Sequence, residues 1–302
     1  MRLSPLASAL VLLTSIGACA PKPPALPGPE IEPRITAYQR EVLGALTGET
    51  EIRPGVKLAN RFAIENKREA RTYIAAQLTK LGLTPQRQPY GTESENVYAV
   101  LSCGRAGAET VVFGAHYDSV RAAPGASDDG TGVVAVLATA RELAKTSPST
   151  TLRAGRTRDI IFVFFDEEER GLVGSKNFAQ MLKDKNTAVH SVHTIDQAGW
   201  DENGNRALEL ELPYPGAVDL YKQAAAALNM TMPLWETTEA GSDHSSFRKL
   251  GFKAIGVTEE YRHKDTTPFI HKAGDTFATI NWPYLAATTR LMIQVMRQLA
   301  MS

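Results

Sequence analysis

The sequence predicts an α/β fold in which a mostly parallel central sheet is flanked by helices on both faces. Segments with the apolar spacing of helices alternate with short apolar runs that are typical of strands. The run at 160–165 is apolar throughout and rich in β-branched and aromatic residues, as in a strand that is buried on both faces of a sheet. Four consecutive acids, Asp166 to Glu169, follow that strand directly.

The first half of the chain alternates helix and strand. Apolar residues at helical spacing predict helices over 35–46 and 70–81, and Gly48 and Gly82 follow as stop signals. Two short apolar runs, 96–101 and 110–115, predict strands, the second of which ends at His116. A helix is expected over 130–144, because Val133, Val136, Leu137 and Ala140 share one face.

The second half continues this alternation after the strand at 160–165. Strands are predicted at 189–195, 207–212 and 253–258, and helices at 217–228 and 283–299. The stretch from 259 to Thr276 has no regular apolar period, so we expect it to be irregular. Strands that are connected through helices lie parallel to one another. The length of the chain predicts that these elements form one domain, over residues 34–302.

Composition bounds the kind of partner. The 302 residues include 33 basic and 33 acidic side chains, so the net charge is zero. No basic excess suggests nucleic acid, and we expect no such partner. The sequence does not specify an oligomeric state.

The N-terminus has the pattern of an export signal. Residues 1–18 combine one basic residue, Arg2, with an apolar run that is too short to span a bilayer. The end of this segment, Ile16-Gly17-Ala18-Cys19, resembles the bacterial lipoprotein box, in which the cysteine is lipidated. We therefore expect an exported lipoprotein of the bacterial cell envelope, held at the outer membrane through Cys19, with the Pro-rich segment 19–33 as a tether. An ordinary cleaved signal is the alternative. Cys103 is expected to be a packed, unpaired thiol.

Three predicted strands end in side chains that bind metals. These are His116, the acids after Phe165, and Asp196. In open α/β sheets, ligands bind at the carboxyl ends of the strands, so we expect these side chains to converge. Closely packed carboxylates repel one another beside a dry strand, and a divalent metal would compensate their charge.

Other motifs could complete such a site. Asp118 can hold the second ring nitrogen of His116, and Asp275 can do the same for His271. In the Gly-rich loop 124–132, one acid of the pair Asp128-Asp129 can cap the following helix while the other bridges metals. The adjacent Glu168 and Glu169 can divide two tasks, since one carboxylate can bind metal while the other takes a proton from water.

These motifs resemble those of the M28 family, which contains co-catalytic zinc aminopeptidases. The resemblance spans about residues 60–300 and rests on several spaced motifs. They are His116-Tyr-Asp-Ser119, Ala126-Ser-Asp-Asp-Gly-Thr-Gly132, Asp166-Glu-Glu-Glu-Arg-Gly-Leu-Val-Gly-Ser175, Ile195-Asp196, Gly241-Ser-Asp-His-Ser-Ser-Phe247 and His271-Lys-Ala-Gly-Asp-Thr276.

The resemblance implies a phosphorylase/hydrolase-like zinc exopeptidase fold, peptide substrates and two zinc ions bridged by Asp128. His116 and Asp196 would hold one ion, and Glu169 and His271 the other. Glu168 would be the general base, while Asp118 and Asp275 would support the ligands from behind. His190, His193 and His244 are expected to be structural.

The chain departs from the family pattern at two positions. Some aminopeptidases of the family have Tyr before the last ligand His and Arg before the Ser-Asp-His motif, whereas this chain has Ile270 and Gly241. Tyr261, Arg262 or His263 could replace the missing groups. Three other functions stay open: a glutaminyl cyclase-like acyltransferase with one zinc, a carboxypeptidase with Arg262 as its carboxylate clamp, and a binding domain without catalysis.

Overall fold

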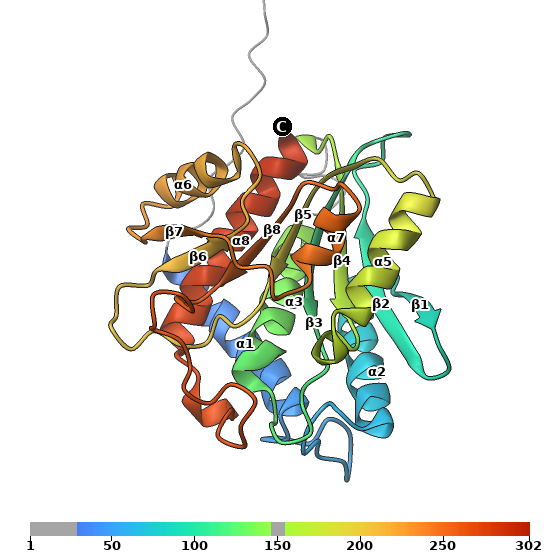
Figure 1. The fold of residues 1–302 in the computed structure, drawn as a ribbon, viewed down its shortest axis with the longest axis vertical. Helices are drawn as coiled ribbons and strands as arrows, with labels where there is room; N and C mark the ends of the chain where they lie inside the picture. The colour runs from blue at the N-terminus through green and yellow to red at the C-terminus, as the bar shows by residue number, and fades with distance from the viewer. Residues whose placement is uncertain (1–28, 146–154) are drawn as a thin grey trace, which may run out of the picture.

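The computed structural model describes residues 29–145 and 155–302. Its centre is one eight-stranded sheet with the order β1-β2-β4-β3-β5-β8-β6-β7 (Figure 1). The strands are β1 (Gln86–Tyr90), β2 (Ser94–Leu101), β3 (Thr110–His116), β4 (Asp159–Phe165), β5 (Val189–Ile195), β6 (Leu208–Glu211), β7 (Leu234–Thr237) and β8 (Ala254–Thr258).

The middle of the sheet is parallel, as predicted, and its edges are mixed. Strands β4, β3, β5 and β8 run parallel to one another. Antiparallel pairing joins β1 to β2, β2 to β4 and β6 to β8, while β7 lies parallel to β6. The carboxyl ends of the four central strands therefore meet at one edge of the sheet.

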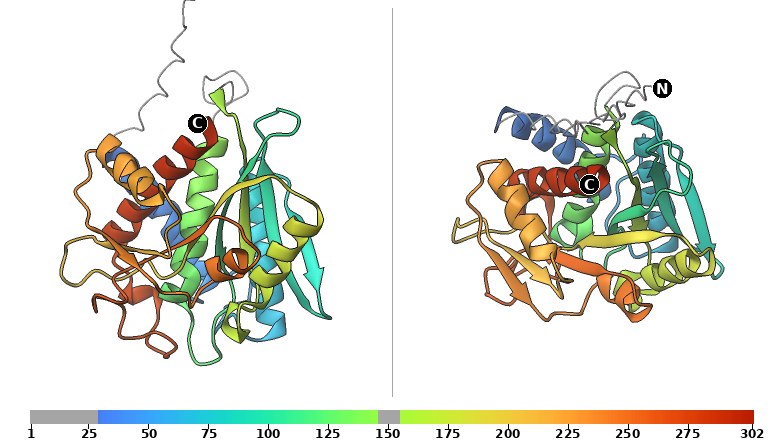
Figure 2. Two further views of the ribbon diagram at one scale, coloured as in Figure 1. Left: turned by 45° about the horizontal axis from the view of Figure 1, so that its top comes forward. Right: turned by 90° about the horizontal axis from the view of Figure 1, so that it is seen from above.

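Helices cover both faces of the sheet (Figure 2). One face carries α1 (Glu32–Leu46), α2 (Ile64–Lys80), α3 (Thr131–Ala144), α6 (Ala217–Ala227) and α8 (Trp282–Met301). The other face carries α5 (Val173–Asp184) and α7 (His244–Lys249). The α/β fold class predicted from the sequence is thus confirmed.

Strand β4 explains why both faces need cover. Its alternate residues Ile160, Phe162 and Phe164 pack into the core beneath α3 and α8. Ile161, Val163 and Phe165 point the other way, into the smaller core beneath α5 and α7. Because a strand alternates its side chains between faces, this apolar run contributes to two cores at once.

Most predicted elements are confirmed, but four were missed. Strands β1 and β7 and helix α7 are short, so their patterns are weak. Helix α5 has a clear apolar face, with Phe178, Ala179 and Leu182 buried, and the prediction overlooked it. Helix α1 begins at Glu32, two residues before the predicted start of the domain. The predicted signal, Cys19 and most of the tether lie outside the described residues. Within 29–145 and 155–302, none of the helices has the length and apolar character needed to cross a bilayer.

Candidate metal centre

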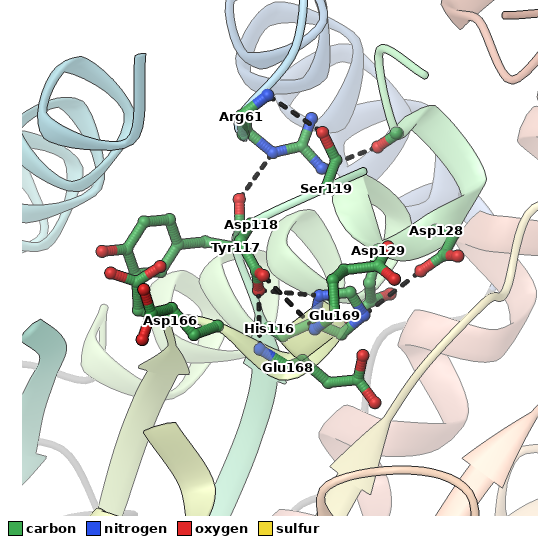
Figure 3. A network of polar contacts seen from close by, with 12 residues as sticks. Arg61, His116, Tyr117, Asp118, Ser119, Asp128, Asp129, Asp166, Glu168 and Glu169 are labelled. Atoms are coloured by element: carbon green, nitrogen blue, oxygen red, sulfur yellow. Dashed lines mark hydrogen bonds and ion pairs between the residues drawn. The ribbon is translucent and has the colours of Figure 1, made fainter. Parts of the chain in front are cut away.

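The predicted site residues come together at the carboxyl edge of the sheet. His116 is the last residue of β3, Asp196 follows β5, and Glu168 and Glu169 lie in a short 3-10 helix, η3 (Glu168–Arg170), just after β4. Asp128 lies in the helical turn η2 (Ala126–Gly130), which leads into α3. Several of these side chains face one another across a small space in Figure 3.

Two groups of potential metal ligands share the carboxylate of Asp128. His116, Asp128 and Asp196 form one group, and Asp128, Glu169 and His271 form the other. Nε2 of His116 lies 3.2 Å from Oδ1 of Asp128 and 3.6 Å from Oδ1 of Asp196. Nε2 of His271 lies 3.1 Å from Oδ2 of Asp128 and 3.0 Å from Oε2 of Glu169. The two oxygens of Asp128 thus face different imidazoles.

The buried carboxylate of Asp118 connects two parts of this arrangement. Its Oδ1 lies 3.3 Å from Nδ1 of His116 and accepts a hydrogen bond from the backbone N–H of Glu168 at 3.0 Å. Its Oδ2 accepts from the backbone N–H of Glu169 at 3.3 Å. Asp118 therefore orients the His116 ring, as predicted, and also holds the turn that carries both glutamates (Figure 3).

Asp129 has the capping role expected for one member of the acid pair. Its Oδ1 accepts hydrogen bonds from the backbone N–H groups of Gly132 at 2.9 Å and Gln197 at 3.2 Å. A Cβ atom at Gly132 would lie 2.3 Å from Oδ2 of Asp129, so only glycine leaves room for this carboxylate. Asp129 therefore fixes the start of α3 while Asp128 faces the ligand groups.

The prediction that Asp275 orients His271 is wrong, because Asp275 holds the loop of Asp128 instead. Its Oδ1 accepts from the backbone N–H of Ser127 at 2.6 Å, and its Oδ2 accepts from that of Asp128 at 3.1 Å. Both oxygens are thus engaged with the loop of Asp128 and do not orient the His271 ring. The reason is geometric, because the chain turns between His271 and Asp275 and carries Asp275 behind that loop.

The four acids after β4 separate into two pairs. Nζ of Lys67, a buried residue of α2, lies 3.0 Å from Oδ1 of Asp166 and 3.1 Å from Oε1 of Glu167. Lys67 therefore compensates the first pair. Glu168 and Glu169 instead line a cavity together with Asp128, Asp196 and His271.

The electrostatics of the centre reflect uncompensated negative charge. Burial and the neighbouring acids raise the pKa of Glu168 to about 10 and that of Glu169 to about 7. A hydrogen bond to Asp128 is the main cause that raises the pKa of His271 to about 9. Burial alone would lower the pKa of His116, but Asp118, Asp128 and Asp196 outweigh it and raise that pKa well above its usual value. A bound cation would favour the ionised carboxylates and the neutral imidazoles.

The residues present fit a divalent metal. Nε2 of His116, Oε1 of Glu169 and Oδ1 of Asp196 are buried and make no hydrogen bond of acceptable geometry within the described residues. Buried polar atoms without partners are costly, and a cation would satisfy them. Imidazole and carboxylate donors without a thiolate suit zinc at an open site.

The cavity beside these groups has a volume of ≈ 230 Å³. Ile270 and Gly241 line it, at the two positions where the sequence departs from the family pattern. Of the three suggested replacements, Tyr261 lines the cavity, whereas Arg262 pairs with Glu239 and His263 with Glu209.

The remaining predicted structural residues behave as expected. His193 is fully buried and lies 2.9 Å from the Tyr221 hydroxyl and 3.1 Å from that of Ser191. His244 is buried beneath the cavity, and His190 is half-buried beside Glu109. Cys103 is a buried free thiol.

Sequence reasoning missed two cations that support the site. One is Lys67, and the other is Arg61, whose buried guanidinium donates hydrogen bonds to the carbonyl oxygens of Tyr117, Pro124 and Gly125. Arg61 thereby ties the segment after β3 to the loop before η2 (Figure 3). Neither residue belongs to a motif, and a single cation in a polar stretch carries no sequence signal that it is buried.

A comparison with protein families shows that residues 96–296 match the model of peptidase family M28. A probable leucine aminopeptidase of Arthroderma otae is 29% identical over 205 residues, which are 64% of this chain and 54% of that protein. Leucine aminopeptidase 1 of Ajellomyces dermatitidis is 27% identical over 207 residues, 64% of this chain and 53% of the relative. The chain thus matches about half the length of these relatives.

Solved structures share the fold. The LapA aminopeptidase of Legionella pneumophila has a TM-score of 0.78 at 20% identity, covering 90% of this chain and 74% of that one. A zinc aminopeptidase of Bacillus subtilis has a TM-score of 0.74 at 14% identity, covering 87% and 95% of the two chains. A glutaminyl cyclase of Porphyromonas gingivalis has a TM-score of 0.69 at 18% identity, covering 87% and 98%.

Proposed function

Because this chain belongs to peptidase family M28, we propose that it is a zinc-dependent aminopeptidase that removes N-terminal residues from peptides. The observation that carries the proposal is the sharing of Asp128 between two groups of potential metal ligands. A bridging carboxylate between two such groups suits a pair of ions that act on one bond. The relatives named leucine aminopeptidase support the same reaction class.

In this proposal two zinc ions are held by the side chains predicted from the sequence. His116 and Asp196 would hold one ion, Glu169 and His271 would hold the other, and Asp128 would be shared by both. When bound, such ions supply Lewis acidity that polarises the scissile carbonyl and makes a water molecule acidic near neutral pH. Asp118 keeps the His116 ring in the orientation that ligation needs.

Glu168 acts as the general base. Its carboxylate takes a proton from the attacking water as the water oxygen bonds to the carbonyl carbon. The same carboxyl then gives the proton to the leaving amine as the C–N bond breaks. Its position supports this role, because Glu168 lines the cavity between the ligand residues and its backbone is held by Asp118.

Two alternatives are less well supported. A glutaminyl cyclase shares the fold, but a single-zinc reaction leaves the second ligand group without a role. A carboxypeptidase would need a free cationic clamp, and the predicted candidate, Arg262, is paired with Glu239.

We also propose that the protein is exported and anchored to the bacterial envelope through lipidated Cys19. The support is the sequence of residues 1–19, which combines a signal pattern with a lipoprotein box. Labelling cells with a radioactive or clickable fatty acid tests this, and a Cys19→Ala variant should lose the label. Label retained by that variant would contradict the anchor.

The enzymatic proposal is tested by metal removal and return. The purified chain is dialysed against a chelator, and zinc is added back stepwise while its content is measured by mass spectrometry. Three peptides are assayed in parallel: one with a free N-terminus, one with a free C-terminus but a blocked N-terminus, and one that begins with Gln. Cleavage of the first peptide, restored at two zinc ions per chain, is expected, without cleavage of the second and without cyclisation of the third. Cyclisation of the third, or cleavage of the second, would replace this proposal by one of the alternatives.

A further inference from the structure

The cavity contains a buried carboxyl group that the proposed zinc chemistry does not use. Glu211, the last residue of β6, lines the cavity and is 5% exposed. Within residues 29–145 and 155–302, its carboxyl oxygens make no hydrogen bond, and the nearest ion-pair partner is Nδ1 of His244 at 3.6 Å. A buried acid without a partner that faces a cavity suggests a ligand that supplies what is missing.

His244 does not supply the missing charge. Its Nε2 lies 3.2 Å from the carbonyl oxygen of Glu239, so Nε2 carries the proton and Nδ1 presents a lone pair to Glu211. Burial lowers the pKa of His244 to about 4, which keeps the ring neutral at physiological pH. Burial, with Asp196 and Glu239 nearby, raises the pKa of Glu211 to about 8. The carboxyl of Glu211 therefore lacks a compensating cation.

A glycine on the neighbouring strand leaves room for the Glu211 carboxyl. Gly256 of β8 pairs with Glu211, and a Cβ atom there would lie 2.3 Å from Oε2 of Glu211. Thr258, the next residue of β8 on the same face, is small and also lines the cavity. Glu239 stands on the wall, paired with the exposed Arg262. The cavity is thus lined by the acid Glu211 as well as by the proposed zinc ligands.

The strand register places Glu211 at a suitable distance from the ligand residues. Gly256 pairs with Thr194 of β5 on one side and with Glu211 on the other. Two inter-strand spacings therefore separate Thr194 from Glu211, or roughly 10 Å. Asp196 lies two residues beyond Thr194, at the edge of the sheet. Glu211 and Asp196 thus line the same cavity from strands that are two positions apart in the sheet.

We propose that Glu211 makes this cavity selective for peptides whose N-terminal residue is lysine or arginine. This inference rests on the aminopeptidase function proposed above. The apolar stem of the side chain would lie along Thr258, and its cationic head would pair with the Glu211 carboxylate. The name of the leucine aminopeptidase relatives suggests an apolar residue instead, so the two expectations are easily separated.

The first experiment compares three peptides with the zinc-loaded chain. They differ only in the first residue, which is lysine, Nε-acetyl-lysine or norleucine. Charge–carboxylate pairing predicts that kcat/KM for lysine exceeds that for norleucine by about tenfold to a hundredfold. Acetylation should remove this advantage. Equal or better cleavage of norleucine would overturn the inference.

A variant assigns the effect to Glu211. The substitution Glu211→Gln keeps the size of the side chain and removes its charge, so the lysine-to-norleucine ratio should fall to within about threefold of one. The matched control is Glu236→Gln, because Glu236 is an exposed acid on the neighbouring strand β7. The control should keep the wild-type ratio. An unchanged ratio in Glu211→Gln would show that another group sets the preference.

Binding distinguishes failure of this inference from failure of the proposed function. Calorimetry with lysinamide and norleucinamide tests the cavity directly, whether or not any peptide is cleaved. Tighter binding of lysinamide, lost in Glu211→Gln, supports the inference even if no aminopeptidase activity is found. Equal binding of the two amides overturns it even if peptides are cleaved. Gly256→Ala should act like Glu211→Gln, because the added methyl would displace the carboxyl.

Discussion

Oδ1 of Asp118 accepts a hydrogen bond from the backbone N–H of Glu168 at 3.0 Å. The same oxygen lies 3.3 Å from Nδ1 of His116. One buried carboxylate thus links the end of β3 to the turn after β4. Through that turn it connects His116, from one group of potential ligands, to the proposed base Glu168 and to Glu169, from the other group. The two halves of the centre are mechanically connected.

The substitution Asp118→Asn should therefore weaken zinc binding. An amide has only one acceptor oxygen, and its NH₂ group would point at either the His116 ring or a backbone N–H. The His116 ring and the backbone N–H each need an acceptor, so one of these contacts would be lost. We expect zinc affinity to fall about tenfold to a hundredfold. Competition with a fluorescent chelator measures this, and circular dichroism checks that the fold is kept. An unchanged affinity in a folded variant would contradict the linking role.

The substitution Glu168→Gln should abolish turnover without removing the metal. The amide cannot take a proton from water, so kcat should fall by about 10²–10⁴. Zinc content, measured by mass spectrometry, should stay near two ions per chain. Glu167→Gln is the matched control, since Glu167 is the adjacent acid but pairs with Lys67 away from the ligand groups. Full peptidase activity in Glu168→Gln would exclude this residue as the base.

The substitution Lys67→Met should destabilise the fold. It leaves the buried carboxylate of Asp166 without the cation 3.0 Å away, and breaking a buried pair in this way costs about 3–5 kcal/mol. Urea denaturation measures the free energy of unfolding. Lys80→Met, an exposed position at the end of the same helix, should change it by no more than about 0.5 kcal/mol. A similar small change in both variants would mean that Asp166 is protonated or solvated in the native protein.

Much of the fold could be predicted because its central strands and long helices have strong apolar periods. The continuous apolar run of β4 predicts a strand, because a strand buried on both faces of a sheet needs apolar residues throughout. The apolar face of α3 likewise predicts a helix. Strand β7 could not be found, because its pairing with β6 at an edge places Trp235 and Glu236 in solvent. The antiparallel direction of β6 depends on long-range pairing, which leaves no local signal.

The ligand groups could be predicted for a related reason. Potential metal ligands at strand ends belong to short motifs, so His116 and Asp196 can be recognised as candidates in the sequence alone. Their support could not be predicted with the same success. Lys67 precedes its partner Glu167 by 100 residues in the sequence. Asp275 accepts hydrogen bonds from backbone N–H groups, and every residue except proline has such a group. Glu211 is one of two acids in a strand whose apolar and acidic residues alternate. The sequence does not show that this strand pairs with β8 or that Glu211 lines a cavity.

Without metal, the chain should lose stability as the pH rises above 6.5. Burial raises the pKa of Glu259 to about 7 and that of Glu211 to about 8. An acid whose pKa is higher in the folded state than in the unfolded state stabilises the fold at low pH, and this stabilisation is lost as the pH rises through the folded-state pKa. His193 and His244 act in the opposite direction, because burial lowers their pKa values to about 3 and about 4.

The contribution of these histidines is complete above their unfolded-state pKa of 6.5, so from there to a pH of about 8.5 the change comes from groups with a raised pKa, which include His271 at about 9. The melting temperature in chelator should therefore fall across that interval. Zinc should reverse the trend, because it binds the ionised carboxylates and neutral imidazoles that higher pH favours. Thermal denaturation at a series of pH values, with chelator or with zinc, measures both slopes. Glu211→Gln should flatten the slope in chelator and Glu236→Gln should not, whereas a melting temperature that rises with pH in chelator would show that these acids are not buried as the structure has them.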